Sequence, residues 1–241
     1  MFYDSSWFIF VLPALLFAMF ASARVNSAYS KYSKEQSYLN MTGQEVARRI
    51  LMNNGINDIS VIRTDGVLTD HYDSKNNTIG LSDEIYGGTS VASIAIAAHE
   101  AGHAVQLEEG YLPLLIRHSL VKVTQFATSA SYIFILLGFF IDMVFGRIGI
   151  ILFIIIFVFQ VVTLPVELNA SNRAINELAT VGAPNEDLDR SQKMLRAAAL
   201  TYLAAMLTAL AQVLRLLSIF GRRRNYGCYE SILLLWKIKE K

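Results

Sequence analysis

The sequence predicts a mainly α-helical membrane protein, with about four transmembrane helices and a small α+β unit inserted between the first and the second. Hydrophobic residues make up 54% of the 241 residues and charged residues only 17%, against about 25% in ordinary soluble proteins. The mean hydropathy is positive, at +0.39. The apolar residues are gathered into long runs, which is the distribution that a bilayer requires.

The first apolar run, 7–23, is just long enough to cross a bilayer as a helix. The residues before it include Asp4 but no lysine or arginine, whereas signal peptides begin with basic residues. We therefore expect residues 1–23 to be a retained N-terminal anchor rather than a cleaved signal.

Three further apolar runs lie in the second half of the chain, at 120–141, 148–164 and 197–220. The connection between the first two of these is short, so residues 120–164 should form an antiparallel transmembrane hairpin. The last run and its arginines form an expected fourth transmembrane helix with a basic flank, 197–224, followed by a tail, 225–241. Basic residues lie near both ends of the predicted spans, and the positive-inside rule therefore favours opposite orientations at different spans. Which side of the membrane the polar insert faces stays open. Four spans nevertheless place 24–119 and 165–196 on the same face of the membrane.

The polar insert, 24–119, has the order helix, small sheet, helix. Thr42-Gly43-Gln44-Glu45 is a capping box that predicts a helix start, and the helix should end near 53–55. Strands are expected at 59–63, 67–72 and 78–81, and a helix at 90–107. We expect the strand at 78–81 to be an edge strand that binds an extended substrate through its backbone.

The second helix of the insert carries His99-Glu100-Ala101-Gly102-His103, an HExxH motif. Residues four apart share a helix face, so both imidazoles can reach one metal ion. Glu100 is offset by one position and can act as the general base on a water. The chain has one cysteine, Cys228, which excludes a cysteine-rich zinc site.

A zinc hydrolase site needs a third protein ligand, for which the sequence favours Glu167. This residue follows Pro165, which suits the first turn of a helix, and Ala170 and Ala174 share its face. Small residues there would let the helix approach Ala101 and Gly102 closely. From the residues alone, a carboxylate at a helix N-terminus is an equally good interpretation of Glu167. The rival ligands are Glu84, Glu108, Glu177 and Asp187.

The stretch 90–106 around HEAGHAVQ, the segment PVELNASNRA and the four spans resemble the YugP-type neutral zinc metallopeptidases of bacterial membranes. The resemblance implies a zincin-like catalytic insert at 24–119. It also implies zinc ligands at His99, His103 and Glu167, the last on a helix within 165–196, with Glu100 as catalytic base. A more distant similarity is to membrane gluzincins with an ExxAD pattern, in which Ser171 here replaces the aspartate.

The expected function is therefore a membrane-anchored zinc metallopeptidase with one Zn²⁺ per chain, acting on peptides or membrane proteins. A net charge of +1 gives no indication of nucleic-acid binding, and the oligomeric state stays open. The alternatives are an intramembrane (site-2-type) zinc protease, a deformylase-like hydrolase and a non-catalytic metal-binding scaffold. His71 is interpreted mainly as a surface histidine rather than an oxyanion donor, and His118 as an interfacial one.

Overall fold

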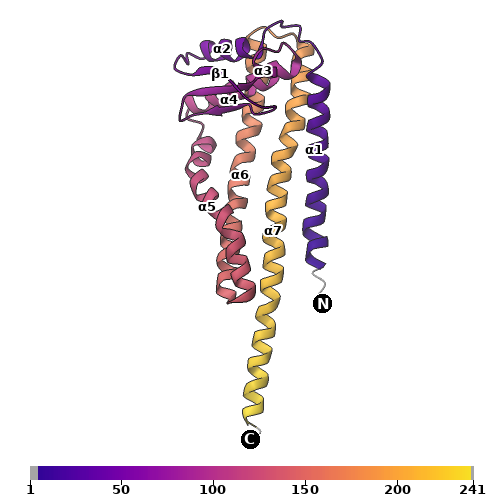
Figure 1. Ribbon diagram of the computed structural model, residues 1–241, viewed down its shortest axis with the longest axis vertical. Helices are drawn as coiled ribbons and strands as arrows, with labels where there is room; N and C mark the ends of the chain where they lie inside the picture. The colour runs from indigo at the N-terminus through magenta and orange to yellow at the C-terminus, as the bar shows by residue number, and fades with distance from the viewer. Residues whose placement is uncertain (1–4, 240–241) are drawn as a thin grey trace. The chain divides into compact units, whose positions relative to one another are not determined.

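The computed structural model places residues 5–239 and describes the side chains of residues 5–220 (Figure 1). The side chains of the predicted tail, of the arginines at 222–224 and of Cys228 lie outside these described residues. The chain forms two compact units. The first comprises Met1–Ala18, Ser119–Val161 and Ala204–Lys241, and the second comprises Met19–His118 and Val162–Leu203.

Four long helices carry the apolar runs. A short π-helix, η1 (Trp7–Val11), leads into α1 (Leu12–Tyr32), and the others are α5 (Leu112–Phe140), α6 (Met143–Thr180) and α7 (Asn185–Lys239). Each of the four contains a stretch that is long and apolar enough to cross a membrane. Only 17–28% of these stretches is buried within the protein, so most of their apolar side chains face outward. The protein is thus mainly helical, with an apolar exterior on four helices.

Within the first unit, α5 and α6 form a helical hairpin whose two helices touch near the turn. A Cβ on Gly138 would lie 2.4 Å from the Cα of Gly146, so the backbones meet where both residues lack side chains. The ring of Phe220 on α7 packs beside them and belongs to a cluster with Ile150, Phe153, Val213 and Leu216.

The second unit contains the polar insert and its own hydrophobic core. The predicted capping box is present at the start of α2 (Gly43–Asn53): the backbone N–H of Thr42 donates to Glu45, and the backbone N–H of Glu45 donates to Thr42. A short helix, α3 (Asp83–Tyr86), precedes α4 (Val91–Glu108). The core lies between α2 and α4 and includes the buried side chains of Val46, Ile50, Ile94 and Ala98.

The sheet has three strands, β1 (Ser60–Thr64), β2 (His71–Asp73) and β3 (Thr78–Ser82), in the order β1-β3-β2. β3 pairs in parallel with β1 and antiparallel with β2. The prediction that this strand is a substrate-binding edge is therefore wrong, because both of its sides already pair within the sheet. The second strand is also shorter than expected: it begins at His71, and Val67 and Leu68 are exposed before it.

Residues 165–196 differ from expectation in their local structure. α6 runs without a break from the apolar run through Pro165 to Thr180, so Glu167 lies inside a helix rather than in its first turn. A proline removes one backbone hydrogen bond, but a long packed helix can continue through it. The chain then turns at Gly182, whose φ is +96°, and α7 begins at Asn185.

Candidate metal centre

Helix α4 carries both histidines of the motif on one face. Its N-terminus is capped by Ser90, whose side chain accepts from the backbone N–H of Ser93. Alanines and branched residues bury most of the rest of the helix surface in the core. His99 and His103 are one turn apart, with their ring centres 4.8 Å apart and their planes nearly perpendicular.

Helix α6 approaches α4 at the glycine of the motif. A Cβ on Gly102 would lie 2.9 Å from the carbonyl oxygen of Ala170, and both Ala170 and Ala174 are fully buried. Small residues on both helices allow this close packing, as the sequence predicted. The approach places Glu167, three residues before Ala170, against the two histidines.

The ligand atoms of His99, His103 and Glu167 converge on one point. One oxygen of Glu167 lies 3.3 Å from Nε2 of His99 and 3.5 Å from Nε2 of His103. All three ligand atoms lie within 4.8 Å of one another. Two imidazole nitrogens and a carboxylate oxygen are a donor set that Zn²⁺ accepts, with room for a fourth ligand. The residues at this place therefore fit the metal that the motif implies.

The other nitrogen of each imidazole is held by a neighbouring side chain. The amide nitrogen of Gln106 donates to the Val166 carbonyl and to the Asn169 side chain, each at 2.8 Å. The amide oxygen of Gln106 must then accept from Nδ1–H of His103, which lies 2.9 Å away. In the neutral imidazole this leaves the lone pair of His103 on Nε2, where it could bind a metal ion, whereas the protonated ring donates from Nε2 to Glu167. Sequence reasoning did not identify this role for Gln106, although it lies three residues after His103 on the same face.

Ser171 provides the corresponding contact for His99. Its hydroxyl oxygen lies 3.3 Å from Nδ1 of His99. This is the position at which the ExxAD pattern has an aspartate, so the serine hydroxyl contacts the imidazole without adding a negative charge.

Burial and neighbouring charges act in opposite directions on the side chains of the cluster. Burial disfavours the charged form of His103, but its hydrogen bond to Glu167 and the charge of Glu100 outweigh burial and raise the pKa of His103 above its ordinary value. The second oxygen of Glu167 lies 3.6 Å from a guanidinium nitrogen of Arg117 in the first turns of α5. One oxygen of Glu167 thus faces the two imidazoles, and the other faces the guanidinium group of Arg117.

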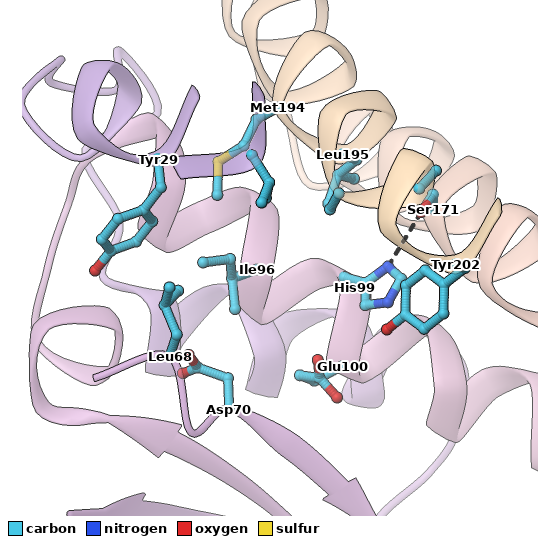
Figure 2. A pocket seen from close by; sticks show the side chains of 13 residues that line it. Tyr29, Leu68, Asp70, Ile96, His99, Glu100, Ser171, Met194, Leu195 and Tyr202 are labelled. Atoms are coloured by element: carbon cyan, nitrogen blue, oxygen red, sulfur yellow. Dashed lines mark hydrogen bonds between the residues drawn. The ribbon is translucent and has the colours of Figure 1, made fainter. Parts of the chain in front are cut away.

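A pocket of about 180 Å³ opens beside the cluster and is called here the Glu100 pocket. It is lined by His99 and Glu100 of α4, by Tyr202 of α7 and Ser171 of α6, and by Tyr29 and Asp70, among others. Figure 2 shows the ring of Tyr202 beside His99, with its hydroxyl on the side of Glu100. Glu100 is 9% exposed, so it is buried in the protein but opens onto this pocket.

The rival ligands lie elsewhere. Glu84 accepts a hydrogen bond from Tyr29, and Asp187 is bound to Ser37 and Arg190. Glu108 and Glu177 are also absent from the cluster that the described residues form. His71 is exposed, with Nδ1 2.7 Å from the Thr69 carbonyl, in keeping with the surface interpretation. The sequence reasoning did not identify Arg117 or Tyr202, since one precedes an apolar run and the other lies inside one.

Comparisons with known proteins agree on one family. The sequence model of the family described as "Putative neutral zinc metallopeptidase" matches residues 7–221. The chain is 41% identical over 227 residues to "Putative membrane protease YugP" of Bacillus subtilis (strain 168), an alignment that covers 90% of this chain and 99% of the relative. No solved structure matches the chain. The match over nearly the whole chain shows that this protein belongs to the neutral zinc metallopeptidase family that this description names.

Proposed function

We propose that this protein is a membrane-anchored, zinc-dependent metallopeptidase of the gluzincin type. The observation that carries the proposal is the convergence of His99, His103 and Glu167 beside a pocket that Glu100 lines. The family and the relative named a membrane protease support it. One Zn²⁺ per chain would be held by these three side chains.

A bound zinc ion would lower the pKa of a coordinated water toward ~7 and polarise the carbonyl of the scissile bond. Glu100 is the residue that takes the proton from the attacking water and passes it to the leaving nitrogen. Its position one residue after His99 makes it face the pocket rather than join the ligands. Gln106 and Ser171 hold the imidazoles in the orientation that this chemistry needs.

Tyr202 is the group best placed to stabilise the charge that develops on the carbonyl oxygen. Its side chain lines the same pocket as His99 and Glu100, and its hydroxyl is a hydrogen-bond donor. A donor already in position where negative charge forms is typically worth 10²–10³ in kcat. Arg117 acts one step further away, by holding the second oxygen of Glu167.

The bilayer is the proposed environment of the four apolar helices, and a bacterial cell membrane the proposed location. The apolar exterior of the helices and the name of the relative support both. Glu167 lies three residues after the apolar run 148–164, within one helical turn of it. The substrates would thus be peptides or segments of membrane proteins that reach the membrane surface, and nucleic acid is not among the proposed partners.

An intramembrane protease fits the molecule less well. Such an enzyme places its HExxH helix inside the membrane, whereas α4 is not among the helices that are long and apolar enough to cross it in the described part of the chain. Such an enzyme also takes its third ligand from a later aspartate, and the nearest candidate in this sequence, Asp189, is exposed and forms an ion pair with Lys193.

The test is cleavage of an unstructured fluorogenic protein substrate, such as dye-quenched casein, by the full chain in detergent with zinc. Wild type should cleave it, and Glu100→Gln should lose at least about 10³-fold in kcat while its zinc content per chain stays equal to that of wild type. Equal cleavage by both proteins would overturn the proposal. Zinc binding without any cleavage by wild type would favour a non-catalytic scaffold.

A further inference from the structure

The Glu100 pocket is mostly apolar but is also lined by a carboxylate away from the proposed metal ligands. Most of its wall is apolar and comes from α4 and α7, for example from Ile96, Leu195 and Ala198. Figure 2 shows Tyr29, Leu68 and Asp70 at the end of the pocket away from His99 and Tyr202. A carboxylate and an aromatic ring thus line the same pocket as Glu100, on the side away from His99 and Tyr202.

The carboxylate of Asp70 is held in place by hydrogen bonds to Ser82. The backbone N–H of Ser82 donates to one of its oxygens at 2.8 Å, and the Ser82 hydroxyl lies 3.1 and 3.2 Å from its two oxygens. Within the described part of the chain, no lysine, arginine or histidine forms an ion pair with it. Burial raises the pKa of Asp70 above its ordinary value, although the hydrogen bonds from Ser82 and the charge of His71 act in the opposite direction.

A carboxylate that is partly removed from water without a counter-ion costs stability, and its charge attracts a cation into the same space. Hydrogen bonds that fix its orientation prepare it for such a partner, because fewer degrees of freedom are lost on binding. The two oxygens retain unused acceptor positions after the bonds to Ser82.

We propose that the Glu100 pocket selects a substrate ammonium or guanidinium group on an apolar stem, with the stem along Ile96 and Leu195 and the cation on Asp70. This inference deepens the proposed peptidase function and rests on it. The chemistry fits the side chain of lysine or arginine next to the cleaved bond, whose methylene groups bury well while the charged end finds an anion.

Tyr29 adds a second feature that favours a cation. Its ring lines the pocket, and its hydroxyl donates to Glu84 at 2.9 Å. The face of an aromatic ring attracts an ammonium or guanidinium group, and the carboxylate bound to the phenol adds negative charge behind the ring. An aliphatic side chain would gain hydrophobic contact with the ring but no electrostatic attraction from the ring face or the carboxylates.

Asp70 also has a structural role, because its bonds to Ser82 join the start of β2 to the end of β3. A purely structural role would affect all substrates equally. The discriminating readout is therefore the preference between two substrates that differ only in charge, rather than the rate with either of them.

The experiment uses the full chain in detergent with zinc and two series of peptides that differ at one position, lysine or norleucine. One series is N-acetylated and the other has a free amino terminus. Cleavage is measured by mass spectrometry and binding by fluorescence anisotropy. Wild type should prefer lysine by at least about tenfold in kcat/KM and in Kd, the effect of one buried charge-assisted contact.

Asp70→Asn retains the shape of the side chain and should reduce this preference to less than about twofold. The matched control is Asp83→Asn, which removes the same charge from an exposed residue next to Ser82 that does not line the pocket and should retain the full preference. If the acetylated peptides with lysine are preferred over those with norleucine, the cation that binds Asp70 is the side chain. If peptides with a free amino terminus are preferred whichever side chain they carry, the cation is that terminus.

Equal use of lysine and norleucine by wild type would overturn the inference, as would an Asp70→Asn variant that loses rate with both but keeps the preference. If instead the proposed peptidase function is wrong, no peptide is cleaved by wild type or by Glu100→Gln. The ratio of the Kd values for the lysine and norleucine peptides then still tests whether the pocket binds a cation.

Discussion

The carbonyl oxygen of Ala170 occupies the space that a side chain at position 102 would need, 2.9 Å from the Cβ that Gly102 lacks. At this point α4 and α6 touch backbone to backbone. Glu167 is one turn of α6 away and reaches both histidines of α4. The cluster of candidate ligands therefore depends on a contact between two glycine- and alanine-containing helix surfaces as much as on the three side chains themselves.

Gly102→Ala should separate the two helices by a few tenths of an ångström. We expect a loss of about 1–3 kcal/mol in stability from overpacking and at least tenfold weaker zinc binding, because Glu167 moves with α6. Both are measurable by thermal unfolding in detergent and by competition with a chelator. Gly87→Ala is the matched control, since the nearest atom to a Cβ there is 3.8 Å away. Unchanged zinc affinity in Gly102→Ala would show that the helix contact does not position Glu167.

Gln106→Leu should weaken zinc binding by about 10–100-fold, because His103 loses the acceptor that holds its proton on Nδ1. The ring can then rotate or place its proton on Nε2. Zinc affinity is measured by chelator competition, with Gln36→Leu as control, an exposed glutamine whose amide donates to Thr89. If Gln106→Leu binds zinc as tightly as wild type, the ring orientation is set by packing alone.

Tyr202→Phe should reduce kcat by about 10²–10³ with little change in KM, because it removes the hydroxyl that would donate to the carbonyl oxygen as charge develops there. Steady-state kinetics on a cleaved peptide measure this split. Tyr38→Phe, at a tyrosine whose ring packs on Arg190 and which is 59% exposed, is the control. A rise in KM without a fall in kcat would assign Tyr202 to substrate binding instead.

The capping box of α2 should give a pH-dependent contribution to stability. Hydrogen bonds from the backbone and hydroxyl of Thr42 lower the pKa of Glu45. A depressed pKa in the folded state stabilises the fold above the ordinary glutamate pKa, and that stability is lost as the pH falls through the depressed value. Glu45→Gln should therefore lower the melting temperature at neutral pH, with a difference from wild type that disappears in acid. A difference that is constant across this range would contradict the assignment.

Much of this molecule could be predicted from local patterns. The apolar runs indicate the four long helices because only hydrophobic composition and length are involved. The capping box and the HExxH spacing are equally local, since each depends on neighbouring turns of a single helix. The placement of His99 and His103 on one face needed no knowledge of the rest of the fold.

What could not be predicted depends on how distant segments meet. The strand order β1-β3-β2 arises from a crossover that no strand pattern reveals, so β3 was expected at an edge. Tyr202 lies in an apolar run, where no local pattern distinguishes it as a site residue. Pro165 was interpreted as a helix start because local rules favour it there, whereas packing continues α6 through it. The choice of Glu167 rested on small neighbours and on family resemblance, and its role as a zinc ligand stays a prediction.

The most direct test of the central claim is the zinc content of the purified chain, after loosely bound metal is removed, in wild type and in Glu167→Ala. Three protein ligands predict about one zinc per wild-type chain and a large loss in the variant, because two histidines alone hold zinc weakly. Glu177→Ala, on the same helix but outside the cluster, should retain the metal. A wild-type chain without zinc, or a Glu167→Ala variant that keeps full occupancy, would contradict the account.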